Sequence, residues 1–294
     1  MGPTSHRLMH DSASARSWFA VLRAALYHDP APVGGVAVAL LAGTYGLFAL
    51  PLAPPLLILG FCGTALAYAV DRVWTERPED RVNRPNRVAW VEAHSGWLAL
   101  ETSIFVAGAV ATVPFLRADT LFWIVALGGI AGLHVLPRGG VPQVLIGLRK
   151  PVVIAGAWAG GALLPVVEAG QPVGLGVLLF FGYRFLFILP NLLLADWGDR
   201  VGDAEAGLRP WAMLWSGKQV RWVATGLLLL AMAGGGLWVI LGPSPFLVAL
   251  DAAGLVLMLG VVWRFDPSRP RDAFLADLVV GWPLIPAFVA WMIV

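Results

Sequence analysis

The sequence predicts an all-α, polytopic membrane protein whose helices form a bundle. Of its 294 residues, 59% are hydrophobic and 13% are charged, and the mean hydropathy is +0.77. Soluble domains carry about 25% charged residues, so this composition indicates a chain that lipid solvates. Its apolar runs of about 20 residues suit helices that cross a hydrocarbon core of about 30 Å, whereas barrel strands need about ten residues.

The chain opens with a polar segment, residues 1–30, that is distinct from the rest. Its apolar part, Trp18 to Tyr27, is short and interrupted by Arg23, and no long apolar core with a small-residue cleavage pattern follows. These features are not those of a secretory signal peptide. We predict a polar tail followed by an amphipathic helix on the membrane surface, and then a single transmembrane domain over residues 31–294.

Nine apolar runs follow, and clusters of proline and glycine separate them. Each run is long enough for one crossing of the bilayer. The predicted spans are residues 33–52, 54–71, 96–116, 119–137, 151–168, 172–195, 220–242, 245–263 and 274–293.

The positions of the basic residues predict the orientation of these spans. Of the 20 lysines and arginines, all but Arg117 and Arg184 fall in the amino-terminal segment or in the loops that follow even-numbered spans. Cytoplasmic loops carry an excess of lysine and arginine. The amino terminus and the long loops are therefore predicted to be cytoplasmic, and the odd number of spans puts the carboxyl end on the other side.

The loop after the sixth span begins with three regularly spaced aspartates. In DWGDRVGDAEAG (196–207), Asp196, Asp199 and Asp203 are three and four residues apart, so a helix that continues through them places the carboxylates on one face. Three anions held that close repel one another unless a cation joins them. Carboxylate oxygens are ligands of Mg²⁺, which commonly bridges to substrate phosphates.

A second acidic segment follows the second span, on the same predicted side. It reads DRVWTERPEDRVNRPNR (71–87) and holds Asp71, Glu76 and Asp80 among arginines. Such charges at the ends of membrane helices can be solvated topology markers, and that interpretation stays open. The alternative is that two carboxylate clusters at one face of the bundle bind divalent ions, with basic residues close by on phosphate oxygens.

Both segments resemble the two aspartate-rich motifs of the UbiA superfamily of intramembrane prenyltransferases. DWGDRVGDAEAG matches the second motif at every acidic position, with Asn191 upstream, and DRVNRPNR (80–87) matches the end of the first, with Asp80 as its last aspartate. The resemblance covers about residues 20–294 and implies nine helices around a lateral cavity. It further implies that Asp80, Asp196, Asp199 and Asp203 are catalytic. These four residues, with Asp71 and Glu76, are also the expected metal ligands.

The first segment departs from the family pattern. Glu76 occupies the place of its middle aspartate, and Arg72 stands where an asparagine is expected. Asp71 lies farther from Asp80 than the leading residues of the motif would, and Pro78 interrupts a helix between them. The chain therefore resembles a divergent branch of the superfamily.

The resemblance implies an Mg²⁺-dependent transfer of an isoprenyl group from an isoprenyl diphosphate to an unidentified acceptor, aromatic or lipid-like. The metal would neutralise the diphosphate leaving group. The expected partners are these two substrates and membrane lipid, with no nucleic acid, and the expected location is a bacterial inner membrane. The candidates to bind the diphosphate are Asn191, Arg149, Lys150, Lys218 and Arg23.

Three ionisable groups fall within predicted spans, where an unpaired charge is costly. They are Glu101, Arg184 and Asp251. We expect Glu101 to pair with Arg184 and to hold two helices together, and the alternative is that Glu101 positions an acceptor.

Other function classes fit the sequence less well. A transporter would favour glycine–proline breaks paired with charges at mid-membrane, whereas the acidic groups here collect at one membrane face. A phosphotransferase of the CDP-alcohol type needs D-G-x-x-A-R before further aspartates, and the order here differs. A UbiA-type terpene cyclase and a non-catalytic family member stay open as alternatives.

Overall fold

The structure is a computed structural model of the 294-residue chain. It describes residues 18–74, 78–132, 143–207, 211–241 and 244–293. Within these ranges the regular structure is helical throughout and contains no strand. The predicted all-α class is therefore confirmed for the described part of the chain.

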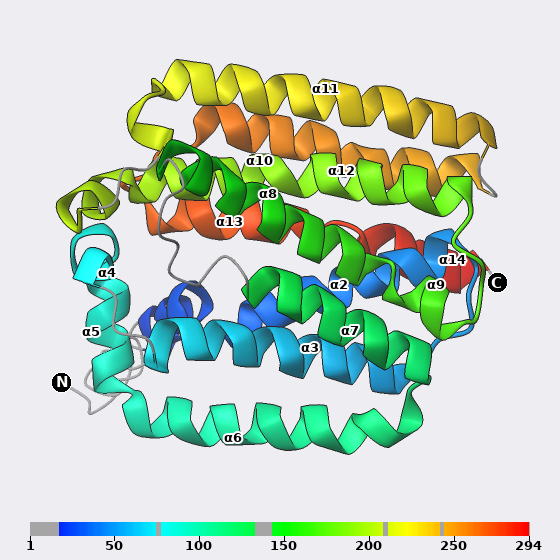
Figure 1. The fold of residues 1–294 in the computed structure, drawn as a ribbon, viewed down its shortest axis with the longest axis horizontal. Coiled ribbons are helices and arrows are strands. Elements are labelled where there is room, and N and C mark those ends of the chain that lie inside the picture. The colour runs from blue at the N-terminus through cyan, green and yellow to red at the C-terminus, as the bar shows by residue number, and fades with distance from the viewer. Residues whose placement is uncertain (1–17, 75–77, 133–142, 208–210, 242–243, 294) are drawn as a thin grey trace, which may run out of the picture.

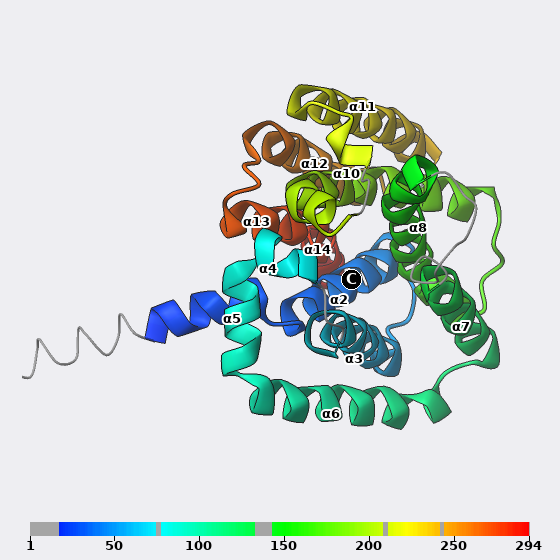
Figure 2. The same ribbon diagram turned by 60° about the vertical axis from the view of Figure 1, so that its left-hand side comes forward.

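Long helices run side by side along the long axis of the molecule, and two short helices cross one end of the bundle (Figures 1 and 2). The short ones are α4 (Pro78–Asn83) and α5 (Pro85–Ala93). The long ones are an N-terminal helix Trp18–His28, α2 (Ala31–Leu47), α3 (Pro54–Ala69), α6 (Ser95–Thr112), α7 (Ala118–Gly132), α8 (Gln143–Ala162), α10 (Leu175–Glu205), α11 (Gly217–Leu241), α12 (Pro245–Arg264), α13 (Pro270–Val280) and α14 (Leu284–Ile293), and α9 (Leu164–Glu168) is a five-residue helix that follows α8.

Each of the nine predicted spans contains a helix or a pair of helices. The fifth is shared by α8 and α9, and the ninth by α13 and α14. Among the described residues, 6 helical segments are long and apolar enough to cross a membrane, or 7 if the N-terminal helix and α2, which meet at 62°, count as one. A multi-pass membrane protein is thus confirmed, and the number nine stays a prediction.

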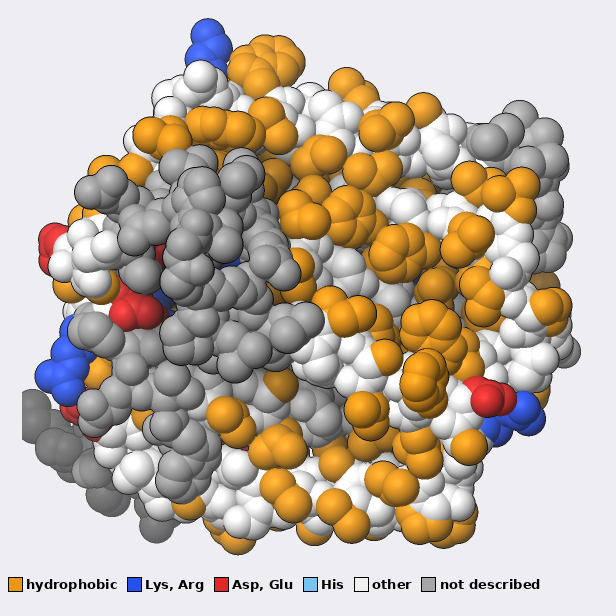
Figure 3. All heavy atoms as spheres, viewed as in Figure 1, with side chains coloured by type: hydrophobic (Ala, Val, Ile, Leu, Met, Phe, Trp, Pro, Cys, Tyr) orange, Lys and Arg blue, Asp and Glu red, His pale blue; other side chains and the backbone are white. Residues whose placement is uncertain are grey.

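The outer surface of the bundle is apolar over most of its length. In Figure 3 hydrophobic side chains cover the helices, and the few charged groups in view gather at the two ends of the molecule. Val125 on α7 is 74% exposed, and Leu175 at the start of α10 is 73% exposed. A monomeric soluble protein rarely exposes so large an apolar area, whereas lipid covers it without cost.

The interior contains a buried ion pair that corrects one prediction. Arg184 on α10 binds Asp251 on α12 through two contacts, Nη1 to Oδ2 at 2.9 Å and Nη2 to Oδ1 at 3.0 Å. Tyr183 donates to Asp251 Oδ2 at 2.7 Å. The predicted pairing of Arg184 with Glu101 is therefore wrong, because α10 packs on α12 whereas α6, which carries Glu101, packs on α3.

The N-terminal helix and the carboxyl end of the last helix lie at opposite ends of the bundle (Figure 1). The N-terminal helix lies at the end that carries α4 and α5, and the carboxyl end of α14 lies at the opposite end (Figure 1). The N-terminal helix exposes large apolar side chains, among them Trp18, Phe19 and Leu22. Its position on a membrane surface stays a prediction.

Candidate active site at one end of the bundle

Helix α10 carries the second acidic motif on its last turns. It is a single helix of 31 residues, apolar through Leu194 and polar from Asp196 to Glu205. The helix ends before Gly207, whose φ of +79° suits glycine in a helix C-cap. The expected helical phase of Asp196, Asp199 and Asp203 is therefore confirmed.

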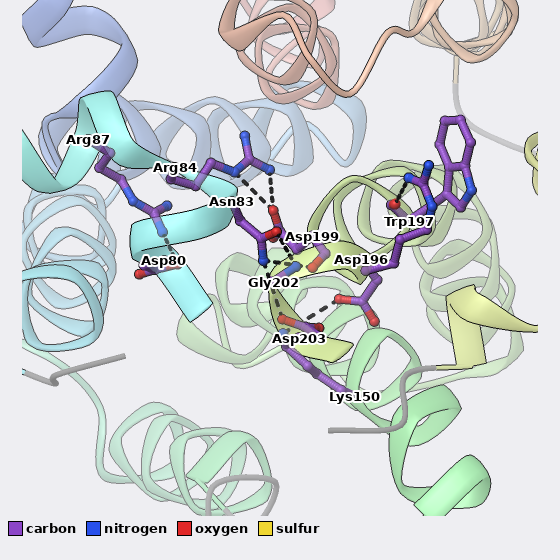
Figure 4. A network of polar contacts seen from close by, with 11 residues as sticks. Asp80, Asn83, Arg84, Arg87, Lys150, Asp196, Trp197, Asp199, Gly202 and Asp203 are labelled. Carbon is purple, nitrogen blue, oxygen red and sulfur yellow. Dashed lines mark hydrogen bonds and ion pairs between the residues drawn. The ribbon is translucent and has the colours of Figure 1, made fainter. Parts of the chain in front are cut away.

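Two prolines shape the first acidic motif. Pro78 begins α4 and Pro85 begins α5, and Arg84 between them has a φ of −138°. A residue before proline avoids the helical conformation, so the chain turns at Arg84. This turn directs Asn83 and Arg84 toward the end of α10, as Figure 4 shows.

Asn83 joins the two motifs through backbone groups of α10. The backbone N–H of Gly202 donates to Asn83 Oδ1 at 2.8 Å, and Asn83 Nδ2 donates to the carbonyl oxygen of Asp199 at 2.6 Å. A Cβ atom at position 202 would lie 2.6 Å from the Asn83 side chain and from the carbonyl oxygen of Glu79. Segments more than 100 residues apart in the chain thus meet at a contact that only glycine permits.

The chain itself supplies the positive charges that the aspartates require. Arg84 Nη2 lies 2.8 Å from Asp199 Oδ1, and Arg87 Nη2 lies 2.6 Å from Asp80 Oδ1. From α8, Lys150 Nζ lies 3.5 Å from Asp196 Oδ1, and Trp211 Nε1 donates to Asp196 Oδ2 at 3.1 Å. Each of these carboxylates therefore has a basic partner (Figure 4).

This arrangement bears on the predicted metal site. The aspartates offer the oxygen ligands that Mg²⁺ prefers. Among the described residues, however, no three acidic, histidine or cysteine side chains converge as a metal site would require. The donor chemistry fits a divalent cation, and ion pairs occupy three of the carboxylates, those of Asp80, Asp196 and Asp199.

A cavity of about 590 Å³ opens beside the joined motifs. Its walls come from the N-terminal helix, α2, the α4–α5 turn, α10 and α13. One end is polar and the rest is mainly apolar. The polar end is lined by Arg72, Asn83, Arg84, Arg87, Asn191, Asp199 and Asp277, and the apolar part by residues such as Val33, Val36, Ala39, Leu192, Leu278 and Leu284.

Comparison with known proteins identifies the fold. No protein-family model matches the chain, and no curated protein sequence does so either. Two solved structures do match. One, concerned with digeranylgeranylglyceryl phosphate synthase in membranes, is 15% identical with a TM-score of 0.53, and the match covers 92% of this chain and 97% of that one. The other is a UbiA homolog from Archaeoglobus fulgidus bound to Cd²⁺, at 12% identity and a TM-score of 0.58, over 90% of this chain and 99% of that one.

The chain has the UbiA fold. Because the alignments reach almost from end to end of both structures, the whole helical arrangement is shared. The predicted fold class is confirmed.

The polar end of the cavity contains further contacts. Asn191 Nδ2 donates to Asp277 Oδ1 at 2.8 Å. Arg72 Nη1 donates to the carbonyl oxygens of His28 and Asp29, at 3.3 and 3.0 Å, and its guanidinium lies over the Tyr68 ring. Burial and the nearby Arg87 and Arg72 lower the pKa of the His28 imidazole, which keeps it neutral at pH 7.

The predicted site residues fall into three groups. Asn191 and Asp199 line the cavity, and Asp80, Asp196, Asp203 and Lys150 lie in the contact network beside it. Lys218 and Arg23 are exposed on α11 and the N-terminal helix, and neither is among the described lining residues. Asp71 lies in the π-helical turn Val70–Trp74, whereas Glu76 and the side chain of Arg149 fall outside the described residues.

Several polar residues that line the cavity are not among the predicted site residues. Asn83, Arg84 and Arg87 lie within the recognised motif, Arg72 departs from it, and Asp277 belongs to neither motif. Asp277 lies within the predicted ninth span, and an acidic residue inside a span commonly marks a functional site, so that rule would have identified it.

Proposed function

We propose that this protein is a UbiA-type prenyltransferase, which moves an isoprenyl group from an isoprenyl diphosphate to a hydrophobic acceptor. One observation carries the proposal. A single cavity joins a polar end, built from both acidic motifs, to an apolar channel between α2 and α13. An isoprenyl diphosphate has the same division into a charged head and an apolar chain.

The apolar part of the cavity would hold the isoprenyl chain. Val33, Val36 and Ala39 lie on one face of α2, and Leu278 faces them from α13. Aromatic rings also line the cavity, namely Tyr27, Tyr68 and Phe274. Their π faces favour a positive charge, such as the allylic cation that forms when the diphosphate leaves, and the surrounding apolar side chains exclude water.

The polar end would hold the diphosphate. Arg84 and Arg87 line it, and guanidinium groups bind phosphate oxygens through paired hydrogen bonds. Asn191, which lines the cavity, would contribute an amide, and Lys150, which contacts Asp196, would contribute a further positive charge. Arg149, Lys218 and Arg23 keep the same predicted role, as candidates that act from the loops or the membrane surface.

We infer that the reaction depends on Mg²⁺, which when bound would neutralise the diphosphate leaving group. The residues to hold it are Asp80, Asp196, Asp199 and Asp203, with Asp71 and Glu76 as further ligands. The Cd²⁺ in the Archaeoglobus fulgidus homolog supports a divalent cation in this fold. The site would face the cytoplasm, where the basic loops are predicted to lie.

The test uses purified protein in lipid nanodiscs with radiolabelled isoprenyl diphosphates and a bacterial lipid extract, with and without Mg²⁺. We expect metal-dependent release of diphosphate and a labelled lipid-soluble product. Asp199→Asn or Asp196→Asn should lower the rate by roughly 100-fold or more, since each removes a charge that the transition state uses.

Asp119→Asn is the matched control, because Asp119 is exposed and its ion pair with Arg117 lies at the opposite end of the bundle. It should keep the wild-type rate. Release that is unaffected by the Asp199 and Asp196 substitutions would refute the proposed site.

A further inference from the structure

Two of the arginines that line the cavity also form ion pairs with the two acidic motifs. Arg84 and Arg87 both face the cavity, and both bind a carboxylate of a different motif, Asp199 and Asp80. Each guanidinium is therefore shared between an internal carboxylate and the space in which a diphosphate would lie.

We propose that Arg84 and Arg87 act as exchangeable counter-ions, which block metal binding in the empty protein and release Asp199 and Asp80 when a diphosphate binds. This inference rests on the proposed function. Metal binding is then controlled by diphosphate: the two bind together, and the metal alone binds poorly.

The geometry of the ion pairs favours an exchange. Arg84 uses both Nε and Nη2 on one oxygen, Asp199 Oδ1, at 2.9 and 2.8 Å, so the two N–H groups converge instead of pairing with two oxygens. A phosphate group offers several oxygens to the same fork, which is the stronger arrangement. The side chains of both pairs are 19–30% exposed, so water reaches them, and such pairs are weaker than fully buried ones.

The exchange requires only side-chain movement. Asn83 holds α4 on α10 through the Gly202 N–H and the Asp199 carbonyl oxygen, and these backbone contacts do not involve either arginine. The two motifs would therefore stay together while Arg84 and Arg87 turn from carboxylate to phosphate.

The two ion pairs explain why no metal ligands converge within the part of the chain that the structure describes. A divalent cation that arrives alone must displace a guanidinium from each carboxylate and leave that guanidinium without an anion. A cation that arrives with diphosphate leaves neither guanidinium without an anion, because the phosphate oxygens bind both arginines. By linkage, the metal must raise the affinity for diphosphate by the same factor.

The test measures binding instead of turnover. Mn²⁺, a spectroscopic substitute for Mg²⁺, is titrated into the full-length protein in nanodiscs and followed by electron paramagnetic resonance, with and without inorganic pyrophosphate. After correction for the manganese–pyrophosphate complex in solution, we expect pyrophosphate to tighten Mn²⁺ binding by about tenfold or more.

Arg84→Gln and Arg87→Gln should tighten the binding of Mn²⁺ alone and weaken its dependence on pyrophosphate. Arg81→Gln is the matched control, because Arg81 lies on the same helix and is exposed. It should behave as wild type. Thermal unfolding identifies any variant that fails to fold, and Arg84→Lys, which keeps the charge but loses the fork, then replaces it and should give an intermediate effect.

Equal Mn²⁺ affinity with and without pyrophosphate, or no change in the affinity for Mn²⁺ alone in a folded Arg84 variant, would overturn the inference. So would tightening by anionic lipid in the nanodisc without any effect of pyrophosphate, because the controlling phosphate would then be a lipid headgroup. If the arginines do not exchange but prenyl transfer occurs, the inference is wrong and the proposed function is unaffected. If the arginines exchange but no prenyl transfer occurs, the proposed function is refuted.

Discussion

Arg184 and Asp251 are the two most deeply buried charged residues described, with 0% and 2% of their surfaces exposed. Tyr183 adds a hydrogen bond to the pair, and the guanidinium lies 4.7 Å from the centre of the Phe180 ring. A charge inside the bundle is tolerated only because its partner offsets the loss of solvation. We therefore assign this pair to the packing of α10 on α12, away from the cavity.

Removal of one side chain of the Arg184–Asp251 ion pair should lower stability much more than removal of both. Arg184→Met leaves an uncompensated carboxylate in the interior, and we expect the free energy of unfolding to fall by about 3–5 kcal/mol. Denaturation in mild detergent, followed by circular dichroism, measures the loss.

The double variant Arg184→Met with Asp251→Leu should recover most of that loss, because no charge remains buried. Asp119→Asn serves as the exposed comparison and should change stability little. Additive losses in the double variant would mean that the two side chains do not depend on each other.

At the scale of residues, the features that could be predicted from the sequence are those that depend on local spacing. The helical phase of Asp196, Asp199 and Asp203 follows from the period of the α-helix alone. The partner of Arg184 does not, because it depends on which helices pack together, and no local pattern distinguishes Glu101 from Asp251. The partners of the aspartates, Arg84 and Arg87, lay within the recognised motif, yet their roles appeared only with the turn at Pro85.

At the scale of elements, the contact between α4 and α10 holds the two motifs together. It depends on Gly202, where a side chain would collide with Asn83 and with the backbone of α4. Because one of the colliding atoms is the backbone carbonyl oxygen of Glu79, the helices themselves would have to move apart.

Gly202→Ala should therefore weaken both stability and activity. We expect the overpacked contact to lower the free energy of unfolding by about 1–3 kcal/mol and to reduce prenyl transfer, since α4 carries Asn83 and positions Arg84. Chemical denaturation and the nanodisc assay measure the two effects.

Gly182→Ala is the matched control on the same helix. Apart from the chain neighbours and the backbone of α10 itself, no atom lies within 4 Å of a Cβ at that position, and alanine favours helix by about 0.5–1 kcal/mol over glycine. A Gly202 variant as stable and active as the Gly182 variant would contradict the role of this close contact.

Element boundaries were predicted well where proline begins a helix and poorly where proline lies inside one. Pro54 and Pro245 mark the starts of α3 and α12, as expected. The sequence predicts that the fifth span begins at Pro151, yet α8 begins at Gln143 and continues through this proline. The ninth span divides around Pro283 into α13 and α14, a break that neighbouring helices stabilise and that hydropathy does not reveal.

At the scale of the whole molecule, the two ends of the bundle have different roles. The end with α4 and α5 carries the cavity's polar part and most of the charged contacts, whereas the other end has short loops. The apolar surface between them determines that the molecule lies across a bilayer, but a bundle can insert in either direction. Charge asymmetry, which acts during insertion, has to decide the direction.

Cysteine labelling tests the orientation. In a Cys62→Ala background, Ser216→Cys lies in the exposed loop before α11, and Gln171→Cys lies in the exposed loop before α10 at the opposite end. We expect a membrane-impermeant maleimide to label the Gln171 variant in intact spheroplasts and the Ser216 variant only after lysis, because the basic loops stay in the cytoplasm. The reverse result would place the polar end of the cavity outside the cell, away from cytoplasmic diphosphates. Labelling of both variants in intact spheroplasts would contradict a bundle whose two ends face opposite sides of the membrane.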